Sequence, residues 1–176
     1  MLVAYLQPDL LVKSTRLGFA EFKSFYQAEF RRAGYSAQDQ GNHDAHTNCL
    51  QERFGIESRW RINLKSLDLK ASIDAEIPIV VSTKYHKFGH ILLVIGYSST
   101  GWYVNDPNGI RDGVKNRYSV VNSGKNYVGA ADFYSHKVAE PNIFRSGFAW
   151  GRMVYRNKGD LTTLTQPEFK SSHHDF

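Results

Sequence analysis

Residues 89–97, GHILLVIGY, and residues 101–107, GWYVNDP, decide the fold of this chain. The first stretch is a continuous apolar run rich in Ile and Val, and the second mixes aromatic with β-branched residues, with SST at 98–100 between them. Two such runs around a short polar turn predict a β-hairpin. His90 enters the first strand and Asp106 follows the second, so two titratable side chains stand at the open end of the hairpin.

The length of the turn decides whether these two side chains meet. A three-residue loop pairs Leu92 with Asp106 and His90 with Asn108, which makes His90 and Asp106 diagonal neighbours with Cα atoms about 7–8 Å apart. A two-residue loop would put them on opposite faces of the sheet. We adopt the three-residue loop and predict a hydrogen bond of about 2.6–3.2 Å between carboxylate and imidazole. Because a histidine oriented by an aspartate is two thirds of a nucleophilic triad, both are candidate catalytic residues.

The sixteen positions from His90 to Asp106, with an apolar strand, Gly-Tyr, a turn and VNDP, resemble the bacteriocin-leader-processing (double-glycine) cysteine peptidases. They resemble more closely the bacterial and phage branch of this family, which belongs to the papain-like superfamily. The preceding residues agree, since 67–75 form a predicted helix and IPIVVS at 77–82 a predicted strand before Gly-His. The resemblance covers roughly residues 48–109, and more weakly the rest to about residue 155. It implies an α+β, papain-like fold, with N-terminal helices packed on a C-terminal antiparallel sheet.

The resemblance also implies the roles of the site residues. His90 would act as general base and acid, and Asp106 would hold its tautomer. In the family, the catalytic Cys begins the first long helix and an oxyanion-hole Gln lies a few residues earlier. The run MLVAYLQP at 1–8 is similar to the middle of that helix, so both positions would fall before residue 1.

Two functions follow from this placement. The first is a cysteine peptidase or amidase-like hydrolase acting on peptide or cell-wall peptide bonds, whose nucleophile lies upstream of residue 1 or has been lost. The alternative is a catalytically inactive relative that serves as a structural or binding module, such as a component of a phage particle. We expect a peptide or peptidoglycan substrate in the first case, and a protein partner in a larger assembly in the second.

Cys49 is the only cysteine of the sequence. If Asp44 caps a helix that runs to Phe54, Cys49 lies on an apolar face and packs in the core. If Thr47 or Asn48 is the cap, Cys49 lies in the first turn, where the helix dipole lowers the pKa of a thiol. We expect the core position, while metal binding and redox roles remain open. The apolar face of the longer helix would consist of Ala45, Cys49, Leu50 and Phe54.

Composition limits the remaining functions. A chain of 176 residues with 41% hydrophobic content is long enough for one domain, which we place at 1–157, with a polar tail at 158–176. The lone cysteine excludes an internal disulfide. The apolar run Met1–Leu6 is too short for a signal peptide and lacks a basic start, and no stretch approaches the roughly 20 residues of a membrane span. We therefore expect a cytoplasmic or virion-associated protein with no membrane span.

Charge and histidine spacing indicate no cofactor. The net charge of +5 would suit anionic surfaces, but Lys and Arg do not alternate with aromatic residues, so we expect no nucleic-acid partner. His43 and His46 lie in a polar helix start without the further ligands of a zinc site, which indicates solvated surface. His86 and His90 lack the neighbouring Glu of a zinc peptidase motif. We expect no metal, and exposed histidines at 173 and 174.

Periodicity gives the remaining elements. Phe19, Phe22, Tyr26 and Phe30 recur at helical spacing. Residues 107–114 contain turn formers and predict a loop. We predict helices at Met1–Leu6, Thr15–Arg32, Ala45–Phe54 and Leu67–Ala75, and strands at Glu57–Asn63, Ile77–Ser82, Gly89–Tyr97, Trp102–Asn105, Tyr127–Ala131 and Phe148–Tyr155.

Overall fold

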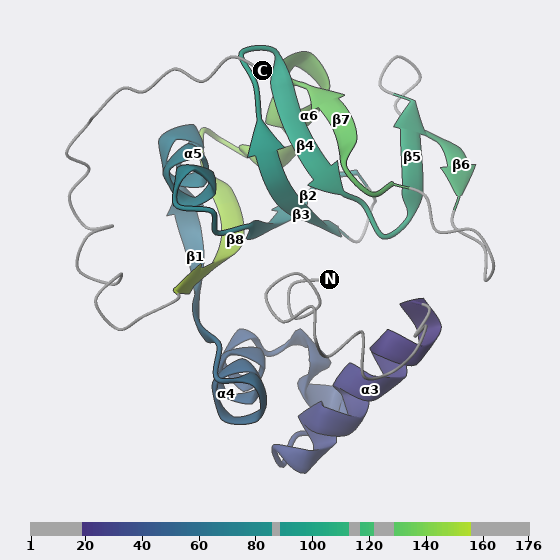
Figure 1. The fold of residues 1–176 in the computed structure, drawn as a ribbon, viewed down its shortest axis with the longest axis vertical. Coiled ribbons are helices and arrows are strands. Elements are labelled where there is room, and N and C mark those ends of the chain that lie inside the picture. Colours follow the sequence, from purple (N-terminus) through teal and green to yellow (C-terminus); the bar gives the residue numbers. More distant parts are fainter. Residues whose placement is uncertain (1–18, 86–88, 113–116, 122–128, 156–176) are drawn as a thin grey trace.

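The computed structural model describes residues 19–85, 89–112, 117–121 and 129–155, in which helices precede and flank an antiparallel sheet (Figure 1). The helices are α3 (Phe19–Arg32), η1 (a 3-10 helix, Ala37–Gly41), α4 (His43–Phe54), α5 (Ser66–Asp74) and α6 (His136–Ile143). The strands are β1 (Glu57–Leu64), β2 (Ile79–Thr83), β3 (His90–Tyr97), β4 (Gly101–Asn105), β5 (Gly109–Asp112), β6 (Arg117–Val121), β7 (Asp132–Ser135) and β8 (Ala149–Tyr155). The predicted α+β class with an antiparallel sheet is confirmed.

Six strands form the main sheet, in the order β1-β8-β2-β3-β4-β7, and all neighbours are antiparallel. The last strand, β8, lies between β1 and β2, so the end of the described chain is held inside the sheet. Strands β5 and β6 form a separate two-stranded sheet. The predicted strands that correspond to β2, β3, β4 and β8 share this antiparallel sheet. Strand β1 also joins it, whereas β5 and β6, which were not predicted, stand apart from it.

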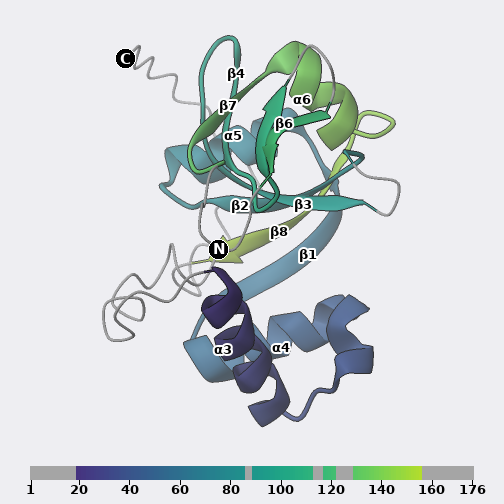
Figure 2. The ribbon, with the colours of Figure 1, turned by 90° about the vertical axis from the view of Figure 1, so that its right-hand side faces the viewer.

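Helices cover both faces of the main sheet, α3 and α4 on one side and α5 and α6 on the other (Figure 2). Side chains alternate along β3 accordingly, because Leu93 packs against α3 and α4 whereas Leu92 and Val94 pack with α5 and α6. Burial on both faces explains the continuous apolar sequence of this strand. The predicted placement of the two N-terminal helices against one face is confirmed for the described residues.

Helix α4 begins at an asparagine that sequence reasoning passed over. Asn42 is the N-cap, and its Oδ1 accepts hydrogen bonds from the backbone N–H groups of Asp44 and Ala45 at 2.9 and 3.3 Å. Asp44, Thr47 and Asn48 were therefore all wrong as caps. The predicted apolar face is confirmed, since the buried residues of the helix are Ala45, Cys49, Leu50 and Phe54.

A buried guanidinium ties α4 to the sheet. Arg152 of β8 donates from Nη1 to Thr47 Oγ1 at 2.7 Å and to Ser58 Oγ at 3.0 Å, and from Nη2 to the His43 carbonyl at 2.8 Å. Because these bonds join α4, β1 and β8, they fix the helix layer over this part of the sheet.

Other predicted elements differ from the structure. Residues 109–112 form strand β5 inside the expected loop 107–114. Residues 129–131 form the turn before β7 rather than a strand, and 127–128 lie outside the described residues. Helix α6 was not predicted, because Pro141 inside it is a helix breaker by sequence rules. The segments 1–18 and 156–176, which include the expected first helix and the polar tail, also lie outside the described residues. None of the described helices is long and apolar enough to cross a membrane.

Candidate active site

A β-bulge in the central hairpin brings His90 and Asp106 to one face. Near the turn, Tyr97 pairs with Trp102, which corresponds to a two-residue loop. Beyond the bulge, Val94 pairs with Val104, which is the register predicted for a three-residue loop. The extra residue between these pairs is Ile95 in β3. The predicted loop length was therefore wrong, while the predicted register at the open end is confirmed.

The two side chains form the predicted hydrogen bond. His90 Nε2 lies 2.8 Å from Asp106 Oδ1, and the side chains are only 7% and 0% exposed. Because an ionised carboxylate only accepts hydrogen bonds, Nε2 carries the proton of the neutral ring. Nδ1 is then the basic nitrogen of this imidazole. The pair therefore has the geometry of a base and its orienting group.

The second oxygen of Asp106 is also bonded. Oδ2 accepts the hydroxyls of Tyr134 at 2.6 Å and of Tyr118 at 2.9 Å, and Oδ1 also accepts the Asn108 backbone N–H at 2.8 Å. Burial alone would raise the pKa of Asp106, but the hydrogen bonds from His90, Tyr134 and Asn108 outweigh it and hold the pKa below its ordinary value. Asp106 is therefore held as a carboxylate.

A glycine fixes the backbone of Asp106. The Asp106 N–H donates to the Gly129 carbonyl at 2.7 Å. Gly129 has φ of +88°, and a Cβ placed there would lie 2.6 Å from the Asp106 carbonyl oxygen and 2.5 Å from that of Gly109. Both the positive φ and the close approach require glycine at this position. The backbone around Gly129 thus sets where the carboxylate stands.

The β5–β6 hairpin is attached beside the dyad. The Arg111 guanidinium of β5 lies over the ring of Tyr85 at 3.9 Å, and it is 5.2 Å from the ring centre of Tyr118 in β6. The ring of Tyr118 in turn stands edge-on to His90, at 6.1 Å between centroids. A cavity of about 220 Å³ next to this cluster is lined by Arg111, Phe133, Tyr134, Ser135 and Val138.

Cys49 does not belong to this site. It is fully buried in α4 and packs in the core between α3, α4 and the sheet. His90 lies on the opposite face of the sheet, two residues from Leu92. Burial is the main cause that raises the pKa of the Cys49 thiol, whereas an active thiolate needs a lowered pKa. The core position expected for Cys49 is confirmed, and a first-turn position is wrong.

The histidines at the start of α4 have structural contacts. His43 is exposed and stacks on Trp60, with ring centroids 3.8 Å apart. His46 is half-buried and bonds through Nδ1 to the Tyr26 hydroxyl and through Nε2 to the Gln40 carbonyl, both at 2.9 Å. The expectation of solvated surface thus holds for His43 and was wrong for His46. Within the described ranges, no three His, Cys, Asp or Glu side chains are grouped to hold a metal.

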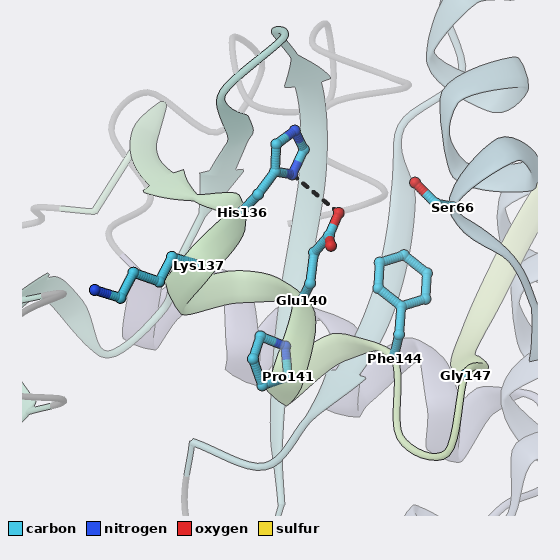
Figure 3. A pocket seen from close by; sticks show the side chains of 7 residues that line it. All are labelled: Ser66, His136, Lys137, Glu140, Pro141, Phe144 and Gly147. Atoms are coloured by element: carbon cyan, nitrogen blue, oxygen red, sulfur yellow. Dashed lines mark ion pairs between the residues drawn. The ribbon is translucent and has the colours of Figure 1, made fainter.

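A larger cavity, of about 660 Å³, lies between the start of α5 and helix α6 (Figure 3). His136 Nδ1 lies 3.0 Å from Glu140 Oε1 across one helical turn, Ser66 faces the same space, and Lys137 points away from it. Neither His90 nor Asp106 lines this cavity. It is therefore separate from the dyad.

Comparison with known families decides what the dyad belongs to. Residues 10–133, well over half of the chain, match the model of the Peptidase_C39 like family. The chain belongs to the Peptidase_C39 like family. It is therefore a cysteine peptidase-like domain, and the matched span includes both His90 and Asp106. Neither the curated proteins nor the solved structures show a significant match to the chain.

Sequence reasoning missed the tyrosines of this Peptidase_C39-like site. Tyr118 and Tyr134 follow Asp106 by 12 and 28 residues, and they come from strands that were not predicted. A weak signal was present in residues 132–135, DFYS, where one polar-tipped aromatic sits in a short β-prone run. Nothing local in the sequence links either tyrosine to Asp106.

Proposed function

We propose that this chain carries the base-bearing part of a cysteine peptidase or amidase site that cleaves peptide or cell-wall peptide bonds. The observation that supports this most directly is the 2.8 Å bond between His90 Nε2 and Asp106 Oδ1 inside a family-matched domain. It gives His90 the role of general base and acid and Asp106 the role of orienting group.

The proposed chemistry uses one thiol and one water. His90 Nδ1 takes the thiol proton while the sulfur attacks the carbonyl carbon, and the resulting imidazolium is stabilised by Asp106. The C–N bond then breaks, and His90 returns the proton to the leaving amine. In the second half, His90 takes a proton from water while the water oxygen attacks the thioester carbon. The C–S bond then breaks, His90 returns the proton to the leaving thiolate, and the acid and the free thiol are released.

The thiol is the missing part of this scheme. Cys49 is the sole cysteine of the sequence, and the sheet separates it from His90. We therefore propose that the nucleophile comes from a segment preceding residue 1 of the sequence given, where the family resemblance would put it. A second polypeptide that supplies the thiol would serve the same chemistry.

The test is to read the gene upstream of the Met1 codon and to express the longer product beside the 176-residue chain. We expect an in-frame segment with Gln and Cys, and hydrolysis of a peptide library by the longer product only. That hydrolysis should be abolished by His90→Ala. It should be unaffected by Cys49→Ser, which is the control because Cys49 lies outside the site. Hydrolysis by the 176-residue chain that Cys49→Ser abolishes would refute the proposal.

A second candidate function is a catalytically inactive structural or binding module. This candidate is favoured by the low solvent exposure of the two residues, since the side chains of His90 and Asp106 are 7% and 0% exposed. A longer product without an upstream cysteine and without hydrolysis would support this candidate. Recovery of the protein from purified phage particles would then identify the proposed assembly.

A further inference from the structure

The geometry points to Tyr134 and Tyr118 as positioning residues of the dyad, which together hold the Asp106 carboxylate in the orientation that presents Oδ1 to His90. This inference deepens the proposed function and rests on it. Both hydroxyls donate to the same oxygen, Asp106 Oδ2, at 2.6 and 2.9 Å. Neither tyrosine is needed to contact a substrate in this role.

Four donors surround the carboxylate and leave it one low-energy orientation. Oδ1 accepts from His90 Nε2 and the Asn108 N–H, and Oδ2 accepts from the two tyrosine hydroxyls. Rotation about the Cβ–Cγ bond of Asp106 would break all four bonds inside a buried site, where unpaired polar groups are costly. The arrangement also favours the ionised form, because all four donors are satisfied together only when both oxygens accept hydrogen bonds.

The two tyrosines come from different parts of the fold. Tyr134 lies in β7 of the main sheet, is 2% exposed and stands edge-on to Tyr85 at 5.7 Å. Tyr118 comes from β6 of the separate hairpin, and its ring also stands edge-on to His90. Because Tyr134 makes the shorter bond and is anchored in the main sheet, we expect it to hold Asp106 more strongly than Tyr118 does.

The groups around Asp106 also favour its ionised, hydrogen-bonded form. Arg111 from β5 lies over the rings of Tyr85 and Tyr118, and His90 is the titratable group on the other side of Asp106. Burial, together with the negative charge of Asp106, raises the pKa of both Tyr118 and Tyr134 above its ordinary value. Both phenols therefore stay protonated and remain donors throughout the pH range in which Asp106 titrates.

The test follows Asp106 by ¹³C NMR and the His90 ring by ¹⁵N NMR in the full chain and in Tyr134→Phe, Tyr118→Phe and Tyr97→Phe. Tyr97 is the matched control, because its hydroxyl donates to a different carboxylate, Asp74 Oδ1, at 2.7 Å. We expect the Asp106 titration midpoint to rise by about one pH unit in Tyr134→Phe and by less in Tyr118→Phe. The fraction of neutral His90 protonated at Nε2 should fall in the same order, with no change in Tyr97→Phe.

Asp106 and His90 signals that match those of Tyr97→Phe in both variants would overturn the inference. If Tyr134→Phe fails to fold, Tyr118→Phe tests the inference alone, because Tyr118 is only half-buried. These readouts need no turnover, so they can fail while the longer protein still hydrolyses peptides. Conversely, a positive result in a protein without hydrolysis would leave the positioning role intact and refute only the catalytic one.

Discussion

His90 and Asp106 share one face of the sheet because β3 contains a single extra residue, Ile95, between the turn and the open end of the β3–β4 hairpin. The pairing of Tyr97 with Trp102 near the turn would put them on opposite faces if it continued to the open end. The bulge shifts the register by one residue, so that Val94 pairs with Val104. As a result, His90 Nε2 lies 2.8 Å from Asp106 Oδ1. The bulge is therefore a part of the site, although it lies at some distance from it along the strand.

Deletion of Ile95 should straighten β3 and leave the dyad in place. Without this residue, the pair of Gly96 with Tyr103 is followed directly by the pair of Val94 with Val104, so His90 and Asp106 stay on one face. We expect the His90–Asp106 bond to remain in a crystal structure of the variant. The free energy of unfolding should fall by about 1–2 kcal/mol, because the partly buried Ile95 side chain is lost from the core. Loss of the His90–Asp106 bond in this variant would contradict the register assigned to the bulge.

Asp106 should make stability depend on pH in the acid range. Its pKa is lowered in the folded state, so its contribution is complete above the unfolded pKa of about 3.9 and is lost as pH falls through the folded pKa. Urea unfolding of the wild type and Asp106→Asn should differ by about 2–3 kcal/mol at pH 6 and progressively less below pH 4. Glu29 also has a lowered pKa, but it is present in both proteins, so its contribution cancels in the difference between their free energies of unfolding. A difference that does not change with pH would argue against an ionised Asp106.

Cys49 should behave as a core thiol. Because it is fully buried and burial raises its pKa, iodoacetamide should label the native protein about 100-fold or more slowly than the protein in urea. The labelling rate in urea should follow the ordinary thiol pKa of about 8.5. Rapid labelling of the folded protein below pH 7 would show a reactive thiol and restore Cys49 as a nucleophile.

Gly129→Ala should displace Asp106. The new Cβ would meet two carbonyl oxygens at 2.5 and 2.6 Å, at a φ of +88°. Gly147→Ala is the matched control, with the same φ of +88° and no heavy atom within 4 Å. We expect thermal unfolding to show a loss of about 1 kcal/mol for Gly147→Ala, from strain alone, and of about 3 kcal/mol for Gly129→Ala. Similar losses would mean that the close approach to Asp106 does not matter.

The sequence predicted those parts of the fold that depend on local patterns. Apolar, β-branched and aromatic runs on either side of turn residues located β3 and β4, and helical spacing located the buried face of α4. The pairing of His90 with Asp106 was also accessible, because both residues belong to one hairpin. The choice of loop was wrong, but the bulge at Ile95 compensated for it.

The remaining parts depend on contacts between distant segments. The insertion of β8 between β1 and β2 joins residues from 68 positions (Ser82 and Trp150) to 98 positions (Glu57 and Tyr155) apart, and no local pattern encodes it. Helix α6 contains Pro141, and its packing against the sheet outweighs the lost backbone donor. Tyr118 and Tyr134 contact Asp106 from β6 and β7, so these contacts depend on how those strands are placed in the fold.

The ¹⁵N chemical shifts of the neutral His90 ring show directly whether Asp106 orients His90 as a base. We predict that Nε2 carries the proton and Nδ1 does not in the wild type, and that Asp106→Ala removes this preference. The ring nitrogens of His43 provide an internal reference, because His43 lies in α4, which packs on the opposite face of the sheet. A His90 ring protonated mainly at Nδ1, or one that Asp106→Ala leaves unchanged, would contradict the account.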